Sequence, residues 1–86
     1  MIDAFIKIKK AYMRRGFNVW GFISRKIQER YHIDINDADR YGIDNTKVIK
    51  LDGDDLHDYA RTHKYEPGVY EYYRVIIAFK EGGKHD

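Results

Sequence analysis

The stretch that decides the fold is Val69–Lys80, with the sequence VYEYYRVIIAFK. Most of it consists of β-branched and aromatic residues, the types that strands favour. Strand alternation puts Val69, Tyr73, Val75, Ile77 and Phe79 on one face and Tyr70, Tyr72, Arg74, Ile76, Ala78 and Lys80 on the other. Because both faces are apolar in its second half, we predict an inner strand of a sheet. The preceding Glu66-Pro67-Gly68-Val69 predicts a type II turn.

The middle of the chain predicts a short strand and two helices. Thr46–Leu51 has strand composition, and Asp52-Gly53 is a turn signal. We expect a helix from Asp54, its cap, with Leu56, Tyr59, Ala60 and His63 on one face. A further short helix is expected to begin at Asn36 or Asp37.

The first third of the chain predicts two helices. Asn18 is a good N-cap for a helix over 19–32, with the apolar stripe Trp20, Ile23, Ile27 and Tyr31. For residues 3–14, Phe5, Ile8 and Tyr12 have helical spacing. The competing interpretation is a strand, because Ile6-Lys7-Ile8-Lys9 alternates. We favour the helix because its pattern runs longer.

These elements predict one α+β domain over residues 1–86, an N-terminal helical hairpin packed on a small sheet in the order α-α-β-α-β. The alternative makes residues 56–65 a strand. Three antiparallel strands would then follow the helices in a winged-helix-like arrangement.

Composition excludes several classes of protein. The chain has no cysteine, so disulfides, thiolate catalysis and cysteine-bound zinc are excluded. The longest apolar run, Val75–Phe79, is too short to span a membrane, and the N-terminus lacks an apolar signal segment. We therefore expect a cytoplasmic protein without membrane association.

The net charge of +2 conceals a split along the chain. Residues 1–33 hold eight basic and two acidic residues, whereas residues 34–66 hold five basic and nine acidic residues. The rest is neutral. Such asymmetry is typical of proteins with charged partners.

No motif predicts an enzyme, a metal site or a cofactor. Ser24, the only serine, has no glycine elbow, and no glycine-rich loop precedes a helix. The spacing of Asp34, Asp37 and Asp39 does not match the ligand pattern of an EF-hand. The residues Asp54, His57, Asp58 and His63 lack facing ligands from a second element.

Our first hypothesis is a small non-enzymatic regulator or inhibitor that binds a protein, for example a nucleic-acid-processing protein with a basic groove. Acidic side chains can complement such a groove, and exposed tyrosine and arginine are favoured interface anchors. We also expect Tyr73 to be buried and Tyr70 or Tyr72 to be exposed. The candidate contacts are Asp37, Asp39, Asp54, Asp58, Tyr70, Tyr72 and Arg74.

The alternative is a nucleic-acid-binding module, because clustered lysine and arginine bind phosphates. It would be helix-turn-helix-like, with residues 19–31 as the first helix and 36–42 as the recognition helix. The acidic Asp37 and Asp39 on that second helix oppose this docking mode. The candidate contacts are Lys7, Lys10, Arg14, Arg15, Arg25, Lys26 and Arg30. The sequence leaves the oligomeric state open.

Overall fold

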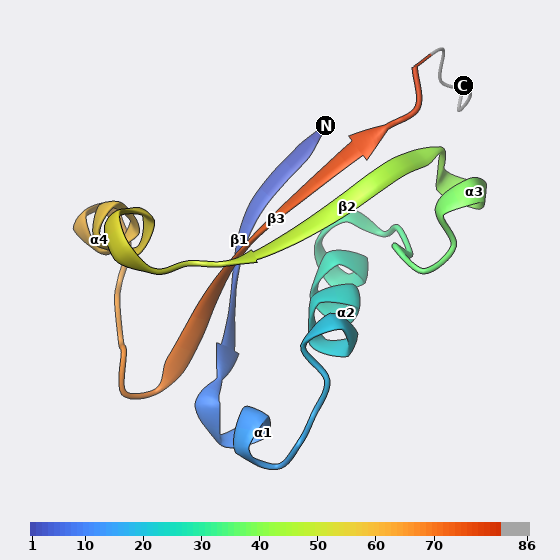
Figure 1. Cartoon of the computed structure of the whole chain (residues 1–86). Helices are drawn as coiled ribbons and strands as arrows, with labels where there is room; N and C mark the ends of the chain where they lie inside the picture. Colours follow the sequence, from blue (N-terminus) through green and yellow to red (C-terminus); the bar gives the residue numbers. More distant parts are fainter. Residues whose placement is uncertain (82–86) are drawn as a thin grey trace.

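Three antiparallel strands form a sheet in the order β1-β3-β2, and four helices accompany it. The computed structural model describes residues 1–81 (Figure 1). Along the chain the elements are β1 (Ile2–Lys9), α1 (Lys10–Arg14), α2 (Val19–Tyr31), α3 (Ala38–Tyr41), β2 (Ile43–Lys50), α4 (Gly53–Thr62) and β3 (Tyr70–Phe79).

The predicted inner strand is confirmed, since β3 pairs with β1 on one side and β2 on the other. Val75 and Ile77 are completely buried, and Tyr73 is buried as expected. The chain enters β3 through a turn in which the Val69 amide donates to the Glu66 carbonyl at 3.0 Å. Gly68 does not adopt the positive φ that a type II turn requires, so this detail was wrong.

The N-terminal segment is the main correction. Residues 2–9 form β1, and only the five residues of α1 are helical where we expected a helix over 3–14. Ala4, Ile6 and Ile8 are buried, and the residues between them are exposed. In a helix Ile6 and Ile8 would lie about 200° apart, so only a strand lets both reach one core.

The helical hairpin packed on a sheet is therefore wrong, and so is its order. β1 is the first element, and the observed order is β-α-α-α-β-α-β. The winged-helix alternative was right in having three antiparallel strands. However, residues 56–65 lie largely in α4 and contribute no strand, and the third strand comes from the N-terminus.

The core lies between one face of the sheet and α2. Asn18 caps α2 as predicted, its Oδ1 accepting from the Gly21 amide at 3.3 Å. Of the predicted stripe, Ile23 and Ile27 are fully buried, whereas Trp20 and Tyr31 are each 38% exposed. Trp20 Nε1 instead donates to Asn36 Oδ1 at 2.6 Å. The stripe therefore reaches the core only at its centre.

α4 lies on the other face of the sheet, so that α2 and α4 flank it on opposite sides (Figure 1). The strand register puts Phe5 and Tyr72 on this second face, and both rings contact Tyr59 of α4. α3 precedes β2 and α4 follows it, which separates these two helices by the length of that strand. None of the helices of residues 1–81 is long and apolar enough to cross a bilayer.

Candidate functional site

One groove runs along β1, where four elements bring basic and aromatic side chains together. It encloses about 260 Å³ and is called here the basic groove. Three of the residues that line the basic groove come from β1, three from α2, one from α1 and one from β3. The lining residues are Lys7, Ile8, Lys9, Tyr12, Phe22, Arg25, Lys26 and Tyr70.

The fold explains why the cations of the basic groove face solvent. Ile6 and Ile8 point into the core, so the alternation of β1 turns Lys7 and Lys9 outward. Arg25 follows the buried Ile23 by two residues, about 200° around α2, and is exposed, whereas Lys26 flanks the buried stripe and is half-buried. Two separate elements thus add their charge to one hollow.

The aromatic rings of the basic groove are ordered by contacts with one another and with the cations. The Tyr12 and Phe22 rings are stacked, with centroids 5.3 Å apart and an interplanar angle of 14°. The Arg25 guanidinium lies 5.1 Å from the Phe22 centroid, and the Lys7 ammonium lies 4.4 Å from the Tyr70 centroid. These are cation–π distances, which leave the charged groups available at the surface.

A second hollow continues from the basic groove across Phe22 and Arg25. It encloses about 270 Å³ and is lined by Phe17, Asn18, Gly21, Phe22 and Arg25. Phe17 packs edge-on against Tyr12 and Phe22, with centroid distances of 6.0 and 5.6 Å. These three rings form the aromatic cluster, and Phe17 remains 50% exposed.

The cations that form salt bridges all lie in the second half of the chain. Within residues 1–81, the five salt bridges use Lys50, Arg61, Lys64, Arg74 and Lys80. No carboxylate of that range lies within salt-bridge distance of Lys7, Lys9, Arg25 or Lys26. The positive charge of the basic groove is therefore not neutralised by described residues of the chain.

The basic residues predicted from the sequence fall into two groups. Lys7, Arg25 and Lys26 line the basic groove. The other four do not: Lys10 borders a different hollow, Arg14 and Arg15 are exposed at the end of α1, and Arg30 donates from Nη1 to the Phe5 carbonyl at 2.9 Å. Lys7, Lys10 and Arg14 do not share one helical face, because Lys7 is in β1 and the other two are in α1.

The helix-turn-helix prediction is not supported by the helix lengths. α2 matches its first helix, but α3 has only four residues and carries Asp39. One helical turn presents too few side chains for a recognition helix in a major groove. The basic residues therefore meet along β1 and not on a helix pair.

The acidic residues proposed to bind a protein do not form one surface. Asp37 and Asp39 lie at α3, and Asp54 and Asp58 lie on α4. The eight residues of β2 between these helices span about 25 Å. Asp39 pairs with Lys80, and Asp58 pairs with Arg61, each at 3.5 Å.

The tyrosine and arginine anchors proposed for that surface are largely engaged within the protein. Tyr72 is only 4% exposed, and its hydroxyl accepts from the Glu66 amide at 2.7 Å. Tyr70 is half-buried, so the expectation that one of the two is exposed is wrong. Arg74 donates from Nε and Nη2 to the two carboxylate oxygens of Asp3, and these hydrogen bonds hold the pKa of Asp3 below its usual value.

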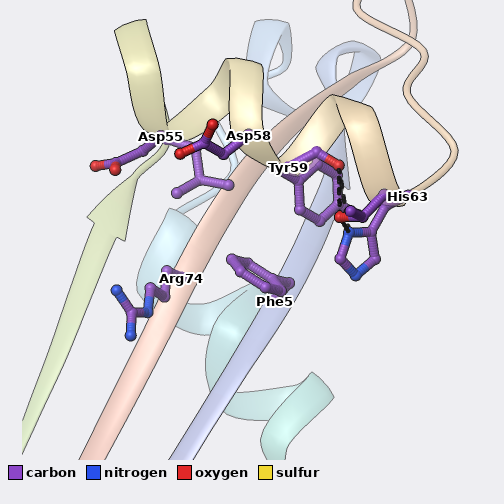
Figure 2. A pocket seen from close by; sticks show the side chains of 8 residues that line it. Phe5, Asp55, Asp58, Tyr59, His63 and Arg74 are labelled. Atoms are coloured by element: carbon purple, nitrogen blue, oxygen red, sulfur yellow. Dashed lines mark hydrogen bonds between the residues drawn. The ribbon is translucent and has the colours of Figure 1, made fainter.

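A third hollow, of about 240 Å³, lies under α4 and is lined in part by Phe5, Tyr59, His63, Asp55 and Arg74 (Figure 2). The Tyr59 and His63 rings stack face to face at 4.2 Å, and burial raises the pKa of Tyr59. His63 Nδ1 lies 3.3 Å from the Tyr59 carbonyl. Residues 1–81 contain no group of three His, Asp or Glu side chains arranged to hold a metal ion.

Among the charged and aromatic residues of the basic groove and the aromatic cluster, the sequence missed four, namely Lys9, Tyr12, Phe17 and Phe22. A strand over residues 2–9 would have found Lys9, because it shares a face with Lys7. Phe17 precedes the Asn18 cap, where a hydrophobic residue usually packs on the first turn. Its partial exposure follows from the tertiary structure alone.

Comparison of the chain with protein-family models, curated proteins and solved structures gave no significant match.

Proposed function

We propose that this protein is a non-enzymatic nucleic-acid-binding module that uses the basic groove. The observation that carries the proposal is the convergence of Lys7, Lys9, Arg25 and Lys26, unpaired within residues 1–81, around three aromatic rings. Clustered cations provide the salt-dependent affinity for phosphates. Aromatic faces beside them provide surfaces on which bases stack.

Charge reversal within the basic groove tests this function. Each cation that contacts a phosphate contributes about 0.7 to the salt slope on a single strand. Lys9→Glu with Arg25→Glu should therefore weaken binding about 100-fold at about 20 mM salt and flatten the slope by about 1.4. Fluorescence anisotropy with labelled oligonucleotides over a salt series measures both quantities.

A matched control reverses two exposed cations elsewhere, Arg40 and Lys47, which have no ion pair within residues 1–81. Arg40→Glu with Lys47→Glu makes the same change in net charge and should cost less than about threefold. Equal losses in the two double variants would show that only net charge matters. The basic groove would then not be the binding site.

A second candidate is the regulator that docks on a basic protein surface through α4. α4 has no buried residue, and its exposed carboxylates include Asp54, Asp55 and Asp58. Asp54 and Asp55 have no ion pair within residues 1–81, so they could complement a basic groove. Asp37 and Asp39 lie too far away to join that contact.

A further inference from the structure

Resting on the proposed function, we infer that the ligand is a single strand of nucleic acid whose bases stack on the aromatic cluster. The phosphates of this strand would lie along Lys7, Lys9, Arg25 and Lys26, and a base would cover the Phe17 ring. Three observations favour a single strand over a duplex or a membrane surface.

The first observation is the position of the exposed ring. Phe17 borders a hollow that shares Phe22 and Arg25 with the basic groove, so a strand held there passes directly over it. Single strands offer unstacked bases to such rings. A duplex keeps its bases stacked inside and would place charged phosphates against the apolar Phe17 ring.

The second observation is the order of the rings. Tyr12 and Phe22 are stacked, Phe17 meets both edge-on, and Arg25 covers Phe22. Because the rings are held before a ligand arrives, a base can stack without the cost of ordering flexible side chains. Tyr12 is 38% exposed and Phe17 is 50% exposed, which leaves surface for that contact.

The third observation separates this surface from a membrane anchor. An interfacial helix buries a continuous apolar face in the lipid headgroup region. α1 has five residues, and the apolar face of α2 is already used by Ile23 and Ile27 in the core. The aromatic cluster is therefore suited to stacking more than to lipid insertion.

The experiment uses the whole chain with labelled oligothymidylate, oligouridylate and duplex DNA of about 12 nucleotides or base pairs. We expect both single strands to bind at least about tenfold more tightly than the duplex at about 150 mM salt. Comparing the two single strands shows whether the ribose 2′-hydroxyl adds to the binding.

Phe17→Ala should weaken single-strand binding about 5-fold to 100-fold and leave duplex binding within about twofold. Phe17→Trp should retain the affinity and show quenching of its fluorescence by oligothymidylate beyond that of wild type, whose only tryptophan is Trp20. The matched control is Tyr31→Ala, which removes another partly exposed aromatic side chain, 38% exposed, at the far end of α2 and should change nothing.

Four results would overturn the inference. Equal or tighter duplex binding, or unchanged affinity of Phe17→Ala, would leave the proposed function standing and exclude stacking on the cluster. No binding of any oligonucleotide at about 20 mM salt would remove the proposed function as well. Binding to vesicles rich in phosphatidylserine without binding to oligonucleotides would identify a membrane surface as the ligand.

Discussion

At the scale of single residues, Tyr73 shows what the sequence could and could not predict. Tyr73 is 6% exposed, and its hydroxyl donates to Glu71 Oε1 at 2.8 Å. Its burial was predicted from strand alternation alone. The Glu71 bond was not, because it joins residues two apart on one face of β3 and depends on where Glu71 lies near the start of that strand, beside Lys50 at 3.6 Å.

This environment predicts a pH dependence of stability. Burial, and then the bond to Glu71, raises the pKa of Tyr73 from 10.0 to about 12. Between these values the unfolded chain releases the phenol proton and the folded chain keeps it. Stability is therefore complete below pH 10 and falls by up to about 2–3 kcal/mol as the pH rises to about 12.

Urea denaturation of wild type and Tyr73→Phe across this alkaline range measures the effect. The variant should lose about 1 kcal/mol at neutral pH through the missing hydrogen bond. The difference between the two proteins should shrink as the pH rises above 10 and reverse near pH 11, because phenylalanine does not ionise and the wild type has by then lost about 1 kcal/mol. Parallel curves would show that Tyr73 ionises as easily in the folded chain as in the unfolded one.

Among the helices and strands, β1 is the one that the sequence analysis predicted wrongly. α2 and β3 were predicted close to their observed bounds, since their patterns and the Asn18 cap are local, and α3 was predicted near its place. β2 begins three residues before the predicted Thr46, and α4 begins at Gly53, ahead of the predicted cap Asp54. Residues 3–14 carry both periods, helical through Phe5, Ile8 and Tyr12 and alternating through Ile6 and Ile8. The choice between them is made by pairing with β3, almost 70 residues away, which no local pattern contains.

Substitutions within β1 test its register. Ile6 is 2% exposed in the core, whereas Phe5 is 38% exposed on the face below α4. Ile6→Ala should cost about 2–4 kcal/mol through loss of buried methylenes and the cavity left behind. Phe5→Ala should cost less than about 2 kcal/mol, because much of its ring is already solvated.

Chemical denaturation gives both values. The helical interpretation placed Phe5 on the main core stripe and therefore expects the opposite order. A larger loss for Phe5→Ala than for Ile6→Ala would thus contradict the strand. The same register places Lys7 and Lys9 in the basic groove, so the result bears on the site as well as on the fold.

In the whole molecule, the charge split along the chain becomes two distinct surfaces. The cations Lys7, Lys9, Arg25 and Lys26 meet at β1, and the exposed carboxylates of α4 lie outside the groove that these cations line. The sequence predicted which segment of the chain is basic and which is acidic. It could not predict which charged side chains come together, because this depends on the strand order β1-β3-β2 and on the length of β2.

This separation makes the two candidate functions distinguishable in one experiment. The carboxylates of Asp54 and Asp58 are exposed and do not line the basic groove, and salt at physiological concentration screens such exposed charges over a Debye length of about 8 Å. Asp54→Lys with Asp58→Lys should therefore change oligonucleotide affinity less than about threefold at about 150 mM salt, whereas the Lys9 and Arg25 reversal removes it. The α4 variant should also melt slightly earlier, because the carboxylates favour the N-terminal half of the helix.

The same two double variants test whether the protein binds a protein partner. Each variant is immobilised for a pull-down, with immobilised wild type as the reference. A protein retained by the basic-groove variant but lost with the α4 variant would establish docking through α4. A protein lost only with the basic-groove variant, and released by nuclease, would be bridged by nucleic acid. Loss of oligonucleotide binding in the α4 variant at about 150 mM salt would mean that the two surfaces act together, against the separation on which the proposal rests.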